Sequence, residues 1–342
     1  MIDILSMNKG ALEEFLLEKG IKKFRASQIF QYIYKQGILD WEAMNLLPKC
    51  DRQVLQETLP VYVPQIVSRL ESADETTTKL LLKLHDGQTV ETVLMRHDYG
   101  NSICISTQVG CAVNCVFCAS AKNGFIRNLT VGEMTGQLLA FKRLGVEALH
   151  SIVVMGTGEP FFNYDNVMAF LRLIHEKETF YLGYRNVTVS TSGIVPKIYE
   201  LAAEKMPVTL AISLHAPTND LRRTIMPITD TYPIEDVVAA ADAYFKATGR
   251  QVTYEYILIK DVNCSTERAE QLAQLLGHKN ILINVIPIND NYDVGLHRPS
   301  RNETYRFISY LQQKGLHVTL RKEMGSNIQA ACGQLRIQRQ EI

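Results

Sequence analysis

The chain has 342 residues, of which 46% are apolar, enough for one large core domain and a smaller appendage. Its 36 basic and 36 acidic residues balance, which excludes a global field that would attract a polyanion. No apolar run is long enough to cross a bilayer, and the first nine residues lack a signal-peptide pattern. We therefore expect a cytoplasmic protein with no membrane association.

Local basic patches are present despite this balance. Solvated helix faces often carry such residues, so charge alone leaves RNA binding open. The candidates are Lys22, Lys23 and Arg25 near the start, Arg222 and Arg223 in the middle, and Arg321, Lys322, Arg336 and Arg339 near the end.

The N-terminal third divides into helices and a hairpin. Apolar residues at three- and four-residue spacing predict helices over 9–18, 26–36 and 51–59. Residues 79–95 change to apolar-rich runs on either side of Asp86-Gly87, which predicts a β-hairpin. We expect a helical accessory domain over 1–60, which would bind RNA, and a hairpin extension over 61–96.

Strands then alternate with helices over 97–342. This alternation predicts an α/β fold with six βα units, a parallel sheet curled into a partial (βα)6 barrel, and ligands at the carboxyl ends of the strands. The expected strands are 102–107, 151–155, 186–191, 208–214, 251–258 and 281–287, with a last strand over 317–321; the expected helices include 130–144, 166–175, 233–248 and 265–276.

The strongest local signal is a CxxxCxxC motif formed by Cys111, Cys115 and Cys118 after the first barrel strand. Three thiolates can hold three irons of a 4Fe-4S cubane and leave the fourth iron open for a substrate, whereas structural zinc usually requires four closed ligands. This spacing is associated with radical S-adenosylmethionine (SAM) enzymes. Zinc binding or chance spacing is the alternative, but no second CxxC pair occurs. Cys50 and Cys264 stand outside any motif.

Polar residues follow the other predicted strands. Gly156, Gly158 and Glu159 follow the second strand, where glycines allow close backbone approach and the carboxylate could accept from the ammonium of SAM. Ser190, Ser213, His215 and Asn289 follow later strands. Each alone is more often a cap or a satisfied core group, but the shared rim is where such sheets bind ligands.

Five segments together resemble the RlmN/Cfr family of radical SAM rRNA adenine methyltransferases, specifically its RlmN branch, over essentially the whole chain. They are CISTQVGCAVNCVFC (104–118), MGTGEP (155–160), STSG (190–193), SLHAP (213–217) and AACGQL (330–335). The resemblance implies methylation of carbon 2 of an adenine in 23S rRNA and of an adenine in tRNA anticodon loops. It also implies a monomer served by an electron donor such as flavodoxin or ferredoxin.

The resemblance also assigns roles to individual positions. Gly158, Glu159, Ser190, Ser213, Leu214, His215 and Asn289 match SAM contacts, Glu91 matches the proposed proton acceptor, Cys332 the methyl-carrying cysteine, and Cys104 its partner thiol. One SAM would methylate Cys332, and a second would be cleaved to a radical that activates this methyl group. Release of the product would leave a Cys104–Cys332 disulfide that must be reduced. Asn327 and Gln329 stand where the family mostly has acidic residues.

Two questions stay open at this level. Glu91 shares a strand face with Val93 and Met95, so its carboxylate is either solvated at an edge or held in an apolar setting that raises its pKa. The reaction could also be a Cfr-like methylation of carbon 8, although Pro160 favours the RlmN branch. A non-catalytic iron–sulfur or zinc protein that binds RNA would leave Gly158, Glu159 and Cys332 unexplained.

Overall fold

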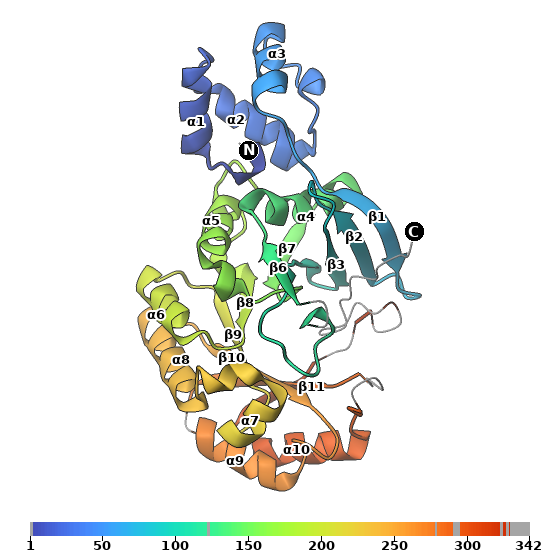
Figure 1. The fold of residues 1–342 in the computed structure, drawn as a ribbon, viewed down its shortest axis with the longest axis vertical. Helices are drawn as coiled ribbons and strands as arrows, with labels where there is room; N and C mark the ends of the chain where they lie inside the picture. Colours follow the sequence, from blue (N-terminus) through green and yellow to red (C-terminus); the bar gives the residue numbers. More distant parts are fainter. Residues whose placement is uncertain are drawn as a thin grey trace.

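The molecule is elongated, with a group of short helices at one end and a curved sheet with outer helices over the rest (Figure 1). The computed structural model describes residues 3–121, 124–277, 279–289, 295–321, 324, 325 and 328. Among these residues, no helix is long and apolar enough to span a membrane.

The N-terminal group is built from short, capped helices. They are η1 (Ile4–Ser6), α1 (Lys9–Glu18), α2 (Arg25–Phe30), the π-helical η2 (Gln31–Gln36), η3 (Trp41–Ala43) and α3 (Lys49–Thr58). The Asn8 side chain caps α1 by accepting from the backbone N–H of Ala11, and η2 ends at Gly37 in the left-handed region. The predicted helix over 26–36 therefore exists, but its second half is a π-helix. Ser6 accepts from the backbone N–H of Gly132, which docks the group against the barrel.

Three antiparallel strands follow and join the barrel sheet directly. They are β1 (Gln65–Glu71), β2 (Thr77–Lys83) and β3 (Thr89–His97). The predicted hairpin turn lies between β2 and β3, with Gly87 at φ 86°. Strand β1 was not predicted, because its residues are nearly all exposed at the edge of the sheet and show no apolar alternation.

The barrel is a run of parallel strands joined by helices. Within the described residues one sheet has the order β1-β2-β3-β4-β7-β8-β9-β10-β11-β12, and each strand from β4 onward runs parallel to its neighbour. The strands are β4 (Gly100–Cys104), β7 (Leu149–Val154), β8 (Val187–Thr191), β9 (Thr209–Ser213), β10 (Val252–Leu258), β11 (Ile281–Pro287) and β12 (His317–Leu320). This confirms the expected partial barrel of six βα units and a last strand.

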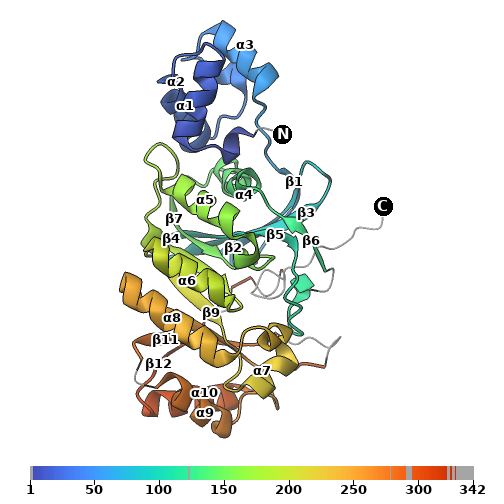
Figure 2. The ribbon, with the colours of Figure 1, turned by 60° about the vertical axis from the view of Figure 1, so that its left-hand side comes forward.

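Helices cover the outer face of this sheet, as Figure 2 shows for α5, α6 and α8. The helices are α4 (Val131–Arg143), α5 (Tyr164–His175), α6 (Val195–Glu204), α7 (Asn219–Ile225), α8 (Ile234–Thr248), α9 (Thr266–Leu276) and α10 (Arg301–Gln313). The strands alternate accordingly: Ile152, Val189 and Ile212 belong to the apolar core, whereas Ser190 and Ser213 are only partly buried.

Shorter elements lie between these strands and helices. They are β5 (Gln108–Gly110), η4 (Ala119–Ala121), β6 (Phe125–Asn128), η5 (Pro160–Asn163), η6 (Tyr184–Asn186) and η7 (Pro227–Asp230). The first barrel strand ends at Cys104 instead of residue 107. The backbone of Ser106 bonds to the Gln137 side chain, which accepts from Ser106 N at 2.8 Å and donates to Ser106 O at 2.9 Å, and Thr107 N then donates to Thr157 O at 2.9 Å.

Candidate active site

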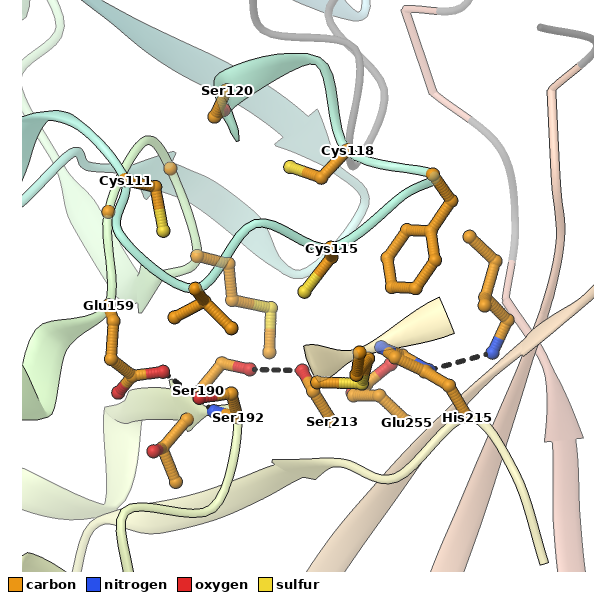
Figure 3. Close-up of a pocket in the computed structure, with 18 of the residues that line it drawn as sticks. Cys111, Cys115, Cys118, Ser120, Glu159, Ser190, Ser192, Ser213, His215 and Glu255 are labelled. Atoms are coloured by element: carbon orange, nitrogen blue, oxygen red, sulfur yellow. Dashed lines mark hydrogen bonds between the residues drawn. The ribbon is translucent and has the colours of Figure 1, made fainter. Parts of the chain in front are cut away.

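Three cysteine side chains from one loop lie above the carboxyl ends of the barrel strands (Figure 3). Cys111, Cys115 and Cys118 line one cavity of about 940 Å³, counting the part that opens to solvent. The loop is held from both sides, since Cys111 N donates to Gly124 O at 3.2 Å and Val116 N donates to Ile225 O at 3.0 Å.

The chemistry of these thiols fits ligands of an iron–sulfur cluster. Burial raises the pKa of Cys111 to about 12, and burial also raises the pKa of Cys115 well above its ordinary value. Buried thiols of this kind would keep their protons unless a metal centre took the place of the proton. The described residues contain no group of three His, Cys, Asp or Glu side chains spaced to hold a single metal ion. In a 4Fe-4S cluster the three thiolates of such a loop would each bind a different iron.

The glycine-rich turn after β7 packs against the residue that precedes the cysteine loop. Gly158 has φ 112°, and a Cβ at this position would lie 2.6 Å from Gln108 Cβ. The Gln108 side chain accepts from Glu159 N at 2.8 Å and donates to Asn128 at 2.8 Å. The glycine therefore allows a close approach of two backbone segments that line the cavity.

Replacing Gly158 by alanine tests this packing. We expect Gly158→Ala to lower the free energy of unfolding by roughly 2 kcal/mol or more, from backbone strain and overpacking, and to weaken SAM binding at least tenfold. Chemical denaturation and equilibrium SAM binding measure the two effects. Gly183→Ala is the matched control, because Gly183 has φ −66° and nothing lies within 4 Å of its added Cβ. Equal behaviour of the two variants would contradict the packing argument.

Glu159 is almost completely buried at the cavity wall, and both carboxylate oxygens hold backbone groups. Ser192 N donates to Oε2 at 2.7 Å and Phe161 N donates to Oε1 at 3.0 Å. Burial raises the pKa of this carboxyl group, although these hydrogen bonds act in the opposite direction. A carboxylate offers about four acceptor positions, so Glu159 can accept from more than these two backbone groups.

Polar groups from the ends of neighbouring strands lie side by side on the cavity wall. Ser190 Oγ and Ser213 Oγ lie 3.5 Å apart at the ends of β8 and β9. His215 has φ 62°, and its Nδ1 accepts from Ile257 N at 3.0 Å. Burial and the nearby Arg222 charge lower the pKa of His215 to about 3, so the ring is neutral and its proton sits on Nε2. His215 can thus donate a hydrogen bond to a ligand in the cavity.

Two predicted SAM contacts are not among the residues that line this cavity. Leu214 is fully buried, and its backbone N–H donates to Glu255 O at 3.1 Å. Asn289 Oδ1 accepts from Arg298 at 3.1 Å. Their roles stay predictions.

An additional polar cluster on the inner face was not predicted. Glu255 on β10 lines the cavity, and its Oε2 accepts from Asn284 at 2.9 Å and lies 3.8 Å from Arg321 Nη1. Arg321 extends across the cavity toward Met155, whose sulfur lies 3.9 Å from Nη1. The available signal was a single charged residue inside the otherwise buried strand β10. Burial raises the pKa of Glu255.

Glu91 and Cys104 lie on the same face of two adjacent strands. Val93 pairs with Cys104, and Glu91 stands two residues before Val93 on β3. Glu91 is 4% exposed, and its Oε1 lies 3.0 Å from Lys79 Nζ on β2. The structure therefore differs from both settings considered for Glu91: the carboxylate is buried, but it is paired with a lysine.

The remaining predicted residues have different outcomes. Lys22 and Lys23 are exposed, next to Phe24 with 52% of its surface exposed. Arg222 was expected on a basic patch, and this is wrong, because its side chain is completely buried. Lys322, Asn327, Gln329, Cys332, Arg336 and Arg339 lie outside the described residues. Cys50 is an exposed thiol and Cys264 a partly buried one.

Comparison with known proteins defines the class of enzyme first. Residues 105–276 match the model of the Radical SAM superfamily, and residues 2–61 match the ribosomal RNA large subunit methyltransferase N-terminal domain. With this match, the partial barrel and the three-cysteine loop define a radical SAM enzyme that uses a 4Fe-4S cluster and SAM.

Full-length relatives then identify the family. A probable dual-specificity RNA methyltransferase RlmN from Clostridium novyi is 41% identical, over 98% of both chains, and one from Desulforamulus reducens is 44% identical, over 98% of this chain and 96% of its own. A radical SAM methyltransferase structure from Sphaerobacter thermophilus aligns with a TM-score of 0.95 and 43% identity, over 98% of this chain and 99% of its own. The chain belongs to the RlmN family of radical SAM RNA methyltransferases.

Proposed function

We propose that this enzyme methylates carbon 2 of an adenine in 23S rRNA and of an adenine in tRNA, through a methylated Cys332. One observation carries the proposal: the three cysteine thiols share a single cavity with the strand-end groups Glu159, Ser190, Ser213 and His215. A cluster on the thiols would thus lie beside a SAM molecule held by the strand ends.

The bound cluster and SAM would supply a carbon radical able to take hydrogen from a methyl group. Such chemistry is needed because carbon 2 of adenine is electron-poor and cannot displace the methyl group of SAM directly. The residues proposed to hold SAM are Gly158, Glu159, Ser190, Ser213, Leu214, His215 and Asn289. His215 donates through Nε2, and Glu159 accepts.

Glu91 is proposed to take the ring proton. The ammonium group of Lys79, 3.0 Å from Oε1, favours the ionised carboxylate at a buried position, and an ionised carboxylate is required to accept a proton. Cys104 is proposed to attack the sulfur of Cys332 and release the product. The shared sheet face of Glu91 and Cys104 supports these roles.

The RNA contacts and the remaining partners are also proposals. We assign RNA binding to the accessory domain over 1–60. The extension covers 61–96, and the catalytic part covers 97–342. The exposed Lys22, Lys23 and Phe24 support the assignment of RNA binding to the first domain. Reduction would come from flavodoxin or ferredoxin. We also propose a monomer in the cytoplasm, where a reducing compartment would keep the cluster cysteines available as ligands.

The product tests the proposed function. With SAM, a reductant and protein-free 23S rRNA, the enzyme should form 2-methyladenosine, as measured by nucleoside mass spectrometry. Pro160 is the first residue of η5, a position where proline is common in helical turns of any protein. Its presence therefore does not by itself distinguish an enzyme that methylates carbon 2 from one that methylates carbon 8. A main product of 8-methyladenosine would place the activity with Cfr. The same assay with tRNA tests the second substrate.

A further inference from the structure

Arg222, on α7, is a completely buried arginine next to the cysteine loop. Its guanidinium donates to three backbone oxygens at the rim of the cavity: Leu214 O at 3.0 Å, Ser213 O at 3.0 Å, and Ser192 O. Two weaker contacts reach Thr229 Oγ1 at 3.3 Å and Tyr232 O at 3.5 Å. Arg222 therefore ties the ends of β8 and β9 together beneath the proposed SAM contacts.

All of these acceptors are neutral. In the described part of the chain no carboxylate forms an ion pair with Arg222. A buried charge without a counter-charge is costly, and carbonyl dipoles offset the cost only in part. Two residues whose backbone oxygens accept from Arg222, Ser192 and Ser213, line the same cavity as Cys115, one of the three cluster cysteines.

Packing holds the cation in place relative to this cysteine. Ile225, three residues after Arg222 on the same helix, accepts from Val116 N at 3.0 Å. Ile225 and Met226 also pack with Cys115 and Phe117 in one apolar cluster. The helix that carries Arg222 and the loop that carries Cys115 therefore form one packed unit.

We propose that Arg222 is the buried counter-charge of the iron–sulfur cluster and that it raises the reduction potential of the cluster. This inference rests on the proposed function only for the presence of the cluster. Reduction adds one negative charge, and a fixed cation nearby favours the more negative state. Arg222 thus acts as a positioning residue: it makes the electron transfer that starts the reaction easier, without touching the substrate.

A redox titration of the reconstituted protein, followed by electron paramagnetic resonance, tests the proposal. At the wild-type midpoint potential, Arg222→Met should show an at least tenfold lower ratio of reduced to oxidised cluster, which is about 59 mV for a one-electron couple. Arg222→Lys keeps the charge but loses the fork of hydrogen bonds, so its ratio should stay within about threefold of wild type. Arg223→Met is the matched control, because Arg223 is 47% exposed and pairs with Asp220 and Asp230; its midpoint should not move.

The outcomes separate the possible failures. A wild-type protein without a cluster would contradict the proposed function. An Arg222→Met protein that holds the cluster and has the wild-type midpoint potential would overturn the counter-charge role alone. So would an Arg222→Lys protein whose midpoint shifts as far as that of Arg222→Met.

If Arg222→Met takes up no iron, Arg222→Gln is titrated instead, and its midpoint potential should show the same negative shift. Failure of both neutral variants, with a normal Arg222→Lys protein, supports the proposal; failure of all three overturns it in favour of a purely structural clamp.

Discussion

Cys118→Ala is expected to lose the cluster. The anaerobically reconstituted wild type should contain about four irons per chain, and the variant close to none, because two thiolates cannot hold a cubane that needs three. Reductive SAM cleavage should fall to background in the same variant. Iron analysis, the visible absorption spectrum and detection of 5′-deoxyadenosine measure these losses.

Cys50→Ala serves as the control for this experiment. Cys50 is an exposed cysteine outside the cavity, so its removal should leave the iron content unchanged. Tetrahedral zinc with no iron in the reconstituted wild type would contradict the cluster assignment and the function built on it.

Cys104→Ala is expected to trap the enzyme on its RNA substrate. If Cys332 carries the methyl group, this variant can still form the link between Cys332 and the adenine, but it lacks the thiol that would attack the Cys332 sulfur. The covalent complex should accumulate. Multiple turnover should fall by roughly 10²-fold or more, because the nucleophile that releases the product is missing. A denaturing gel with labelled RNA would show a slow band that requires both SAM and reductant.

Cys332→Ala is the opposite case, because it has no group to donate. It should bind RNA and form no slow band. Normal turnover of Cys104→Ala, or a covalent band with Cys332→Ala, would show that the assigned roles are wrong. Glu91→Gln should also show the slow band on the same gel, because a covalent complex that keeps its ring proton cannot release the product.

The cluster motif and the barrel could be predicted from the sequence because their signals are local. Cys111, Cys115 and Cys118 lie in one short loop, so their spacing alone indicates a shared metal centre. The βα alternation likewise reflects burial on one or both sides of successive strands, and the structure confirms it. Strand β1 was missed for the corresponding reason: it is exposed on both faces and carries no such pattern.

Residues with unusual environments were harder to predict. In the sequence Arg222 looks like part of a basic surface, since it stands next to Arg223, which is exposed. Within α7 the side chain of Arg222 points inward, against carbonyl groups at the end of β9 and in the loop after β8. The side chain of Arg223 points outward. Sequence neighbours on a helix point in different directions, so the charges alone do not distinguish them.

The sequence by itself determined the fold class, the cysteine loop and the positions of the strand-end polar groups. Each of these depends on periodicity or on spacing within a short segment. Only the tertiary structure decided that Lys79 pairs with Glu91, that Glu255 meets Arg321 over strand β11, and that Arg222 is buried beside the cysteine loop. Strand register, sheet curvature and helix docking bring these groups together, and a short-range pattern carries no information on such contacts.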